Sequence, residues 1–238
     1  MPLPSLENGL DLLHRGGWVM VPLMALSVVS VTVMIERALF IREAAAQNEQ
    51  MIEALRPLLL EGRFDEALHK MDRASGPVAE TMRAGIDAHR LPMADIERAM
   101  EEVALRQAPL LSHNLGALDT IITMAPLLGL LGTITGMIRA FNVVSTAGSS
   151  APTAITGGVA EALIATATGL SIAIVTLPIY NFLSERVKEI IGEMELRATQ
   201  LLNILAHGKR REERQTPVSA VLWRDKAVLP ASPTPRTY

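Results

Sequence analysis

One carboxylate lies within an apolar stretch of the sequence where a charge is unexpected. Glu161 belongs to "GGVAEALIATATGLSIAIVTLPIYN" (157–181), a segment rich in small residues and threonine. An ionisable side chain inside a membrane span is costly, about 2.5–3.5 kcal/mol for Asp or a basic residue at a helix centre, and it usually faces a helix bundle or a water-filled path. We therefore expect Glu161 to be functional. The alternative is a solvated carboxylate that is merely tolerated near the outer interface, because it lies only about 10 Å into the helix.

Three threonines are expected to accompany this carboxylate. Thr168 follows Glu161 by nearly two helical turns and shares its face, whereas Thr166 is rotated from Glu161 by about 140°. Thr133 lies on the preceding apolar segment, and an antiparallel arrangement of the two segments brings it to a similar depth. Hydroxyls and one carboxylate can organise water and relay a proton. For any single threonine, a bond back to the i−4 carbonyl is the simpler alternative.

Other chemistries lack the residues that they require. The chain has no cysteine, which excludes a disulfide scaffold and thiolate metal sites. His69, His89 and His113 are separated by 20 and 24 residues and have no local metal-ligand spacing. We find no nucleophile–base pair and no Walker loop, so we expect no enzyme activity and no cofactor. The net charge of −3 argues against a nucleic-acid partner.

The distribution of charge predicts three membrane spans. Residues 16–35, 120–138 and 162–184 form stretches of 20, 19 and 23 residues without Asp, Glu, Lys or Arg. A transmembrane helix needs about 20 predominantly apolar residues. We therefore expect an all-α integral membrane protein in which three transmembrane helices are joined to long helices of a cytoplasmic domain.

Lysine and arginine predict the orientation of these spans. Residues 36–114 and 184–238 hold ten each, whereas 1–16 and 139–154 hold one each. The positive-inside rule places the two basic segments in the cytoplasm and the N-terminus outside, in a bacterial inner membrane. The first residues lack a basic n-region, so they do not indicate a cleavable signal peptide.

These patterns predict eight consecutive segments. They are a periplasmic N-terminal segment (1–16), transmembrane helix one (17–35), a cytoplasmic helical loop (36–114), transmembrane helix two (115–141), a short periplasmic link (142–153), transmembrane helix three (154–183), a cytoplasmic helical extension (184–207) and a disordered cytoplasmic tail (208–238).

Glycines mark the expected contact between the second and third spans. Gly129, Gly132 and Gly136 are spaced at i, i+3 and i+7 and share one helix face, and the third span opens with Gly157 and Gly158. Small residues on one face allow helices to approach closely in a bilayer, where packing replaces the hydrophobic driving force. We expect all five to pack helices together.

Two segments resemble the paired signature of the MotA/TolQ/ExbB proton-channel family. They are "APLLGLLGTITGMIRAF" (125–141) and "GGVAEALIATATGLSIAIVTLPIYNF" (157–182). The three spans, the large loop after the first span and the short outer link are similar to the ExbB/TolQ branch, whereas a MotA-type stator has four spans. The 36–114 loop and the chain after about residue 205 carry no specific match.

The resemblance implies a stator that is driven by the proton motive force. Five such subunits would enclose a dimer of a single-span partner, ExbD or TolR, whose membrane aspartate carries the proton, and a TonB- or TolA-like protein would join the complex. Carried over to this chain, the pore hydroxyls are Thr133 and Thr166, and the membrane carboxylate is Glu161. Asn181 marks the cytoplasmic end of the third span. Asp119 would face the cytoplasmic mouth, although solvation at the interface is the simpler account.

Several alternatives stay open at this point. A membrane scaffold or assembly protein without ion flux would have the same spans, and so would a pore assembled by oligomerisation. A sodium path also uses threonine hydroxyls, so the choice of the proton rests on the resemblance. TonB-linked import, Tol-type envelope maintenance and gliding or secretion all remain possible as the process that is powered.

Overall fold

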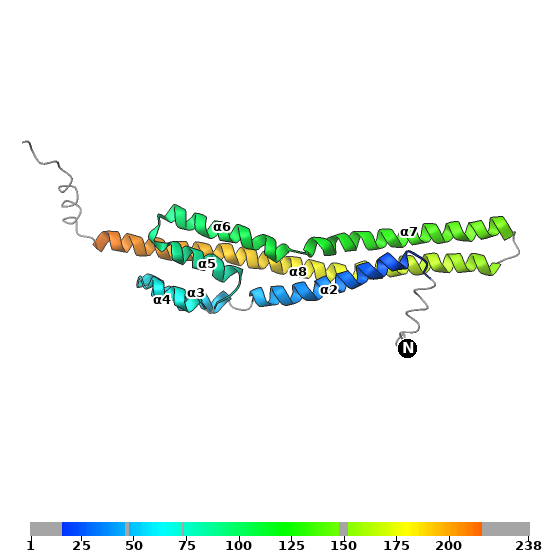
Figure 1. Ribbon diagram of the computed structural model, residues 1–238. Coiled ribbons are helices and arrows are strands. Elements are labelled where there is room, and N and C mark those ends of the chain that lie inside the picture. The colour runs from blue at the N-terminus through cyan, green and yellow to red at the C-terminus, as the bar shows by residue number, and fades with distance from the viewer. Residues whose placement is uncertain (1–15, 46–47, 73, 148–151, 216–238) are drawn as a thin grey trace, which may run out of the picture. The chain divides into compact units, whose positions relative to one another are not determined.

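The chain folds as helices throughout its described parts. The computed structural model describes residues 16–45, 48–72, 74–147 and 152–215, and every regular element in these ranges is helical, which confirms the predicted all-α class. The elements are α2 (Met20–Ala45), α3 (Asn48–Leu60), α4 (Phe64–Met71), α5 (Pro77–Asp87), the 3-10 helix η1 (Ala88–Arg90), α6 (Met93–Ser112), α7 (Leu115–Ala147) and α8 (Pro152–Gln215) (Figure 1).

Three helical stretches are long and apolar enough to cross a membrane. They are Met20–Ala44, Met93–Ser145 and Thr156–Arg210, which confirms the three predicted spans. No more than 28% of the most apolar window of each stretch is buried within the chain. Most of this apolar surface is therefore left for lipid or for other protein chains.

Contacts divide the chain into two compact units, which we describe separately. The first comprises residues 1–46 and 105–192, and the second comprises residues 47–104 and 193–238. The helices α6 and α8 each contribute to both units because each crosses a boundary between these ranges.

The first unit packs α2 against α7 and the N-terminal half of α8. Its core forms where the start of α2 meets the first half of α7 and the N-terminal part of α8. The buried members are Val19, Met20, Leu23 and Ala125, and Leu26, Leu128, Ile164 and Ile172 pack against them. These side chains belong to all three predicted spans, so the spans form one bundle within the subunit.

Small residues set the distance between α7 and α8. A Cβ on Gly136 would lie 2.8 Å from the Gly158 carbonyl oxygen and 2.9 Å from the Cβ of Ala162. A Cβ on Gly129 would lie 3.0 Å from the Cα of Thr166. Backbone meets backbone at these positions, and only glycine leaves enough room for that approach.

The other predicted packing glycines differ in their surroundings. Gly132 faces Ala165 across the same contact, and a Cβ on Gly158 would lie 2.9 Å from the Cβ of Ala140. Gly157 is exposed, and nothing lies within 4 Å of the place of its Cβ, so it does not pack in this helix pair. The reason is rotation: successive residues of a helix are about 100° apart, which turns Gly157 off the face that Gly158 presents.

Several helices of the first unit end at other residues than the expected ends of the spans. α7 starts at the predicted Leu115, where Asn114 has a φ of 62° that interrupts the helical path from α6. α2 runs ten residues past the expected end at 35, and α7 runs six residues past 141. A span ends where charge appears, but a helix continues as long as the following residues favour helix, as the alanine-rich segment after Glu36 does.

α8 passes without a break through two expected boundaries, at 183 and 207, and ends at Gln215. Residues 208–215, expected in the tail, are therefore helical. The remainder of the predicted tail, 216–238, lies outside the described residues, as do most of the N-terminal segment (1–15) and the centre of the outer link (148–151).

The second unit is a small helical domain with an apolar core. α3, α4, α5, η1, the N-terminal part of α6 and the C-terminal part of α8 contribute to it. Gly85 on α5 lies against Met100 of α6 and Leu201 of α8, because a Cβ there would be 2.5 Å from the Met100 sulfur. Its largest fully buried side chains are Leu55, Met71, Met82, Ile86, Ile96, Met100, Met194 and Leu201.

We predict that Gly136→Ala lowers the stability of the protein and that Gly157→Ala does not. Alanine favours helix over glycine by up to about 1 kcal/mol, so Gly157→Ala should leave stability unchanged or raise it. Gly136→Ala adds a methyl group where the Gly158 carbonyl lies 2.8 Å away, and overpacking of this kind costs about 1–3 kcal/mol. Thermal unfolding of the detergent-solubilised protein measures both. Equal melting temperatures would contradict the close α7–α8 contact.

Candidate functional site

Thr166 connects α8 to the backbone of α7. Its hydroxyl Oγ1 donates a hydrogen bond to the Gly129 carbonyl oxygen at 2.9 Å. That carbonyl belongs to a helix, so the bond is available only because the helices approach closely at Gly129, which has no side chain. A hydroxyl has one donor and two acceptor lone pairs, so Thr166 retains acceptor capacity for water or for another chain.

Thr133 and Thr168 bond within their own helices. The Thr133 hydroxyl donates to the Leu130 carbonyl at 2.6 Å, and the Thr168 hydroxyl donates to the Ile164 carbonyl at 2.8 Å. This is the local bonding that threonines in membrane helices commonly adopt. Both side chains are half-buried.

Glu161 forms an ion pair with a residue of the neighbouring helix. Its Oε1 lies 2.5 Å from Nη1 of Arg139 on α7, and the exposed fractions of the two side chains are 19% and 50%. Gly17, just before α2, forms a further wall: a Cβ there would lie 2.7 Å from the Glu161 Cδ. Gly17 has a φ of +71°, a conformation that glycine adopts without a steric cost. The carboxylate thus lies between Arg139 of α7, its own helix α8 and the residue Gly17 that precedes α2.

The predicted pathway residues do not form one cluster within the subunit. Glu161 lies beside Arg139 and Gly17, whereas Thr166 contacts the α7 backbone. Thr168 is on the same face of α8 as Glu161, two turns along. Each of these side chains has its own partner, so a shared path requires surfaces beyond this one chain.

The contacts between α7 and α8 place Thr133 and Glu161 at similar depths along the helix pair. Gly136 lies against Ala162, and Gly132 lies against Ala165. Thr133 follows Gly132, and Glu161 precedes Ala162. The two side chains are therefore separated along the helix axis by little more than half a turn.

Asp119 and Asn181 lie toward the other end of this helix pair, and both are exposed. The backbone carbonyl of Asp119 accepts a hydrogen bond from the Thr123 hydroxyl at 3.2 Å. Their exposure is compatible with a mouth and with plain solvation at the interface.

A second charged cluster lies near this end and was not anticipated from the sequence. Arg37 on α2 is 5% exposed; its Nη1 donates to the Leu110 carbonyl at 3.2 Å, and its Nη2 lies 2.6 Å from the Glu36 carboxylate. The other oxygen of Glu36 accepts a hydrogen bond from the Asn114 amide at 3.1 Å. These bonds connect α2 to the end of α6 and to Asn114, which lies between α6 and α7.

Arg139 and Gly17 were also missed as site residues. In the sequence, Arg139 only ends an uncharged stretch, and Gly17 only begins one. The antiparallel register that brings Thr133 near the depth of Glu161 puts Arg139 about one turn away on the outer side, within reach of a long arginine side chain, so the pair was accessible to sequence reasoning. The close contact at Gly17 was not, because it depends on how the chain enters α2.

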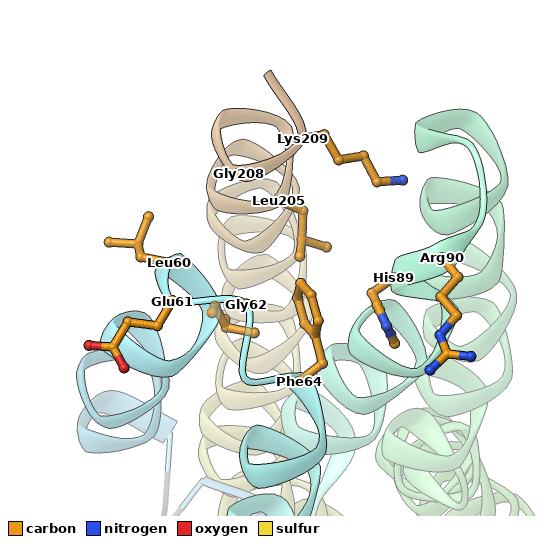
Figure 2. Close-up of a pocket in the computed structure, with 10 residues that line it drawn as sticks. Leu60, Glu61, Gly62, Phe64, His89, Arg90, Leu205, Gly208 and Lys209 are labelled. Carbon is orange, nitrogen blue, oxygen red and sulfur yellow. The ribbon is translucent and has the colours of Figure 1, made fainter. Parts of the chain in front are cut away.

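The second unit contains a groove of about 720 Å³ that is separate from these residues. Figure 2 shows the Phe64 and His89 rings side by side within it, and their centroids are 4.1 Å apart. The His89 Nδ1 lies 2.8 Å from the Ile86 carbonyl oxygen, and Lys209 at the rim donates to the Leu91 carbonyl. Both side chains therefore have partners within the second unit. Within the described residues, no group of three His, Cys, Asp or Glu side chains could hold a metal ion.

Comparisons with known proteins agree with the arrangement of the spans. The model of the MotA/TolQ/ExbB proton channel family matches residues 73–196, which include the α7–α8 pair and Glu161. An ExbB homologue from Methanothermobacter thermautotrophicus is 28% identical over 79% of this chain and 67% of its own length. An ExbB-like protein from Synechocystis is 33% identical over 70% of this chain and 80% of its own.

A third relative is a TolQ, the second of the two protein types that give the ExbB/TolQ branch its name. The Tol-Pal system protein TolQ of Haemophilus influenzae is 37% identical over 47% of this chain and 50% of its own length. Together with the three apolar helices, these relatives identify a multi-pass inner-membrane protein. The chain belongs to the MotA/TolQ/ExbB proton channel family, in its ExbB/TolQ branch.

Proposed function

We propose that this chain is the channel-forming stator subunit of a machine driven by the proton motive force, and that it has no enzyme activity of its own. The observation that carries this proposal is Glu161, a paired carboxylate within the α7–α8 helix pair that the family model covers. Five copies would surround a dimer of an ExbD- or TolR-like single-span protein. Proton flow through the ring would drive this partner, which would act on the envelope, together with a TonB- or TolA-like protein where one is present.

The exposed apolar surface of the first unit supports assembly into a ring. Large side chains along both helices remain at least one-third exposed in the single chain. On α7 they include Leu127, Leu130, Ile134 and Phe141, and on α8 they include Leu163, Leu170, Ile174 and Val175. Three helices are too few to enclose an ion path, so such a path needs several subunits. In a ring of subunits, lipid would cover only the outer part of this apolar surface.

The hydroxyls of Thr133 and Thr166 are suited to line such a path. Each donates to a backbone carbonyl and keeps its oxygen lone pairs available. In an apolar environment these lone pairs are strong sites for water or for a protonated carboxyl of a partner. Glu161 would contribute nearer the outer end and Thr168 slightly deeper than Thr166, with Asp119 and Asn181 at the cytoplasmic mouth.

The proposed orientation follows from charge. The N-terminus and the α7–α8 link face outward, and the second unit and the end of α8 face the cytoplasm, where most of the Lys and Arg residues lie. Protons entering from the outside would then meet the level of Glu161 before that of Thr166.

A second candidate is a membrane scaffold without ion flux. The observation in its favour is that the predicted pathway groups already have partners within the chain: Glu161 pairs with Arg139, and Thr166 bonds to Gly129. Static packing would produce the same contacts. The two candidates differ in whether the assembled complex conducts.

The first expected result concerns composition. The chain purified from native membrane with its bound proteins should contain five copies of this chain and two of a small single-span protein. Mass measurement of the intact detergent-solubilised complex gives both numbers. A ring without a partner would remove the proposed carrier of the proton, and a monomer would contradict the stator.

The second expected result concerns conduction. Glu161→Ala and Thr166→Val should each reduce proton flux through the reconstituted complex by about tenfold or more, because each removes a hydrogen-bonding group worth about 1–1.5 kcal/mol or more in an apolar path. Flux is measured with a pH-sensitive dye inside vesicles, and membrane fractionation confirms insertion of each variant.

Thr176→Val is the matched control for this experiment. Thr176 is also on α8, is 1% exposed, and donates only to the Ile172 carbonyl of its own helix at 2.7 Å. Its replacement by the isosteric valine should leave flux unchanged. Wild-type flux in both Glu161→Ala and Thr166→Val would exclude these residues from the path, and absence of flux in the wild-type complex would favour the scaffold.

A further inference from the structure

The groove of the second unit has apolar walls. Leu59 on α3 and Leu205 on α8 both line it, and each is only 3% exposed. The stacked rings of Phe64 and His89 form a flat surface beside them, with 20° between the ring planes. The His89 Nδ1 is directed to the Ile86 carbonyl, so the ring is held in this orientation. An apolar side chain from outside can therefore be received between two leucines and a ring face.

A second cavity of about 530 Å³ adjoins this groove, because Arg90 and Lys209 line both. The other described residues that line the second cavity are Leu91, Pro92, Met93, Ala206 and Arg210. These lining residues thus include three cations and no Asp or Glu. We call the groove the apolar half of the site and the second cavity its basic half.

The cations of the basic half retain the capacity to bind an anion. Lys209 donates to the Leu91 carbonyl oxygen, which uses one of the three donors of its ammonium group. Arg90 is exposed and makes no hydrogen bond or ion pair with the described residues. Four other arginines of the second unit do pair with a carboxylate: Arg63, Arg83, Arg98 and Arg197. The positive charge of Arg90 is therefore uncompensated in the part of the unit that the structure describes.

Glu61 is the acidic residue among the described lining of the apolar half, and it does not neutralise the basic half. Its carboxylate lies 3.1 Å from the Arg63 guanidinium. Figure 2 shows this carboxylate directed away from the Phe64 and His89 rings. The site as a whole therefore combines an apolar groove with a positively charged end.

We propose that this site binds an extended acidic peptide segment of another protein, with an apolar side chain of the peptide in the apolar half and its carboxylates at Arg90 and Lys209. Successive side chains of an extended peptide point to opposite sides, so one apolar residue enters the groove while neighbouring acidic residues remain near the rim. Burial of the apolar side chain supplies affinity, and the complementary charges supply specificity and a fast association rate. The inference concerns the second unit and is independent of ion flow through the first.

The shape of the site favours a peptide over a membrane surface. Basic clusters also attract anionic lipid headgroups. The apolar side chains of this site, however, lie in the wall of a groove, and Leu59 and Leu205 are almost fully buried. They cannot insert into a flat bilayer, whereas a single side chain of a peptide can reach them.

The test uses the full complex in nanodiscs of neutral lipid and three pools of fluorescein-labelled octapeptides. One pool is random in Asp, Glu, Leu and Phe, the second in Lys, Arg, Leu and Phe, and the third in Asp, Glu, Ser and Gly. We expect the complex to retain the first pool most strongly, the third weakly and the second least. Retention of the first pool no greater than that of the second, or its displacement by phosphatidylglycerol vesicles, would overturn the inference, the latter in favour of a membrane surface.

Charge variants locate the binding of the first pool. Arg90→Gln and Lys209→Gln should each weaken binding by about two- to fivefold, the range expected for one exposed ion pair, and added salt should weaken binding further. Arg98→Gln is the matched control, because it removes the same charge from an arginine that is 78% exposed and lies 3.4 Å from Asp95. Equal binding by Arg90→Gln, Lys209→Gln and Arg98→Gln would contradict the assignment of the basic half.

Two glycines of α8 allow the apolar half to be filled without disturbing the helix. Nothing lies within 4 Å of a Cβ at Gly208, which lines the groove, or at Gly192, which does not. Leucine favours helix more than glycine does, so neither Gly208→Leu nor Gly192→Leu should impair folding. Gly208→Leu should weaken binding of the first pool by about tenfold, as expected when burial of one apolar side chain is lost. Equal binding by the two variants would exclude the groove as the docking site, whether or not the complex conducts protons.

Discussion

The close contact between α7 and α8 is the constraint on which the candidate site depends. Where Gly129 and Gly136 meet α8, the two backbones approach to distances that no side chain would allow. This approach brings the Gly129 carbonyl within reach of the Thr166 hydroxyl. It also fixes the register, and the register in turn brings Arg139 within reach of Glu161. A looser helix pair would lose all three relationships together.

An apolar surrounding explains why the polar side chains of this pair have partners. Water is scarce within a bilayer, so hydroxyls and charges must be satisfied by the protein. Thr133 and Thr168 use carbonyls of their own helix, Thr166 uses a carbonyl of the facing helix, and Glu161 uses a cation. Among the four, only Thr166 and Glu161 link two helices, so substitutions there affect packing as well as chemistry. This is why each functional variant needs a control that changes packing alone.

The sequence was sufficient for the features that depend on composition and local order. Uncharged stretches predicted three spans, and the interruption at Asn114 coincides with the predicted start of α7 at Leu115. Helix ends were less predictable, because α8 continues to Gln215 beyond its span. For the site, the sequence named individual residues, whose roles stay predictions, but not the contacts that they make. Gly17 shows the reason: its approach to Glu161 depends on a backbone turn that the sequence does not encode locally.

The positions of the charges determine what can carry a proton across the first unit. One paired cluster, Arg37 with Glu36, lies at one end, and Arg139 with Glu161 lies toward the other. Between them, residues 120–138 of α7 and 162–184 of α8 contain no Asp, Glu, Lys or Arg. Hydroxyls can order water there, but the threonine hydroxyl neither gains nor loses a proton at neutral pH. Within these two stretches no side chain gains and loses a proton at neutral pH, so a titratable group at mid-depth would have to come from another chain. The uncharged middle is therefore the observation that supports the titratable partner proposed above.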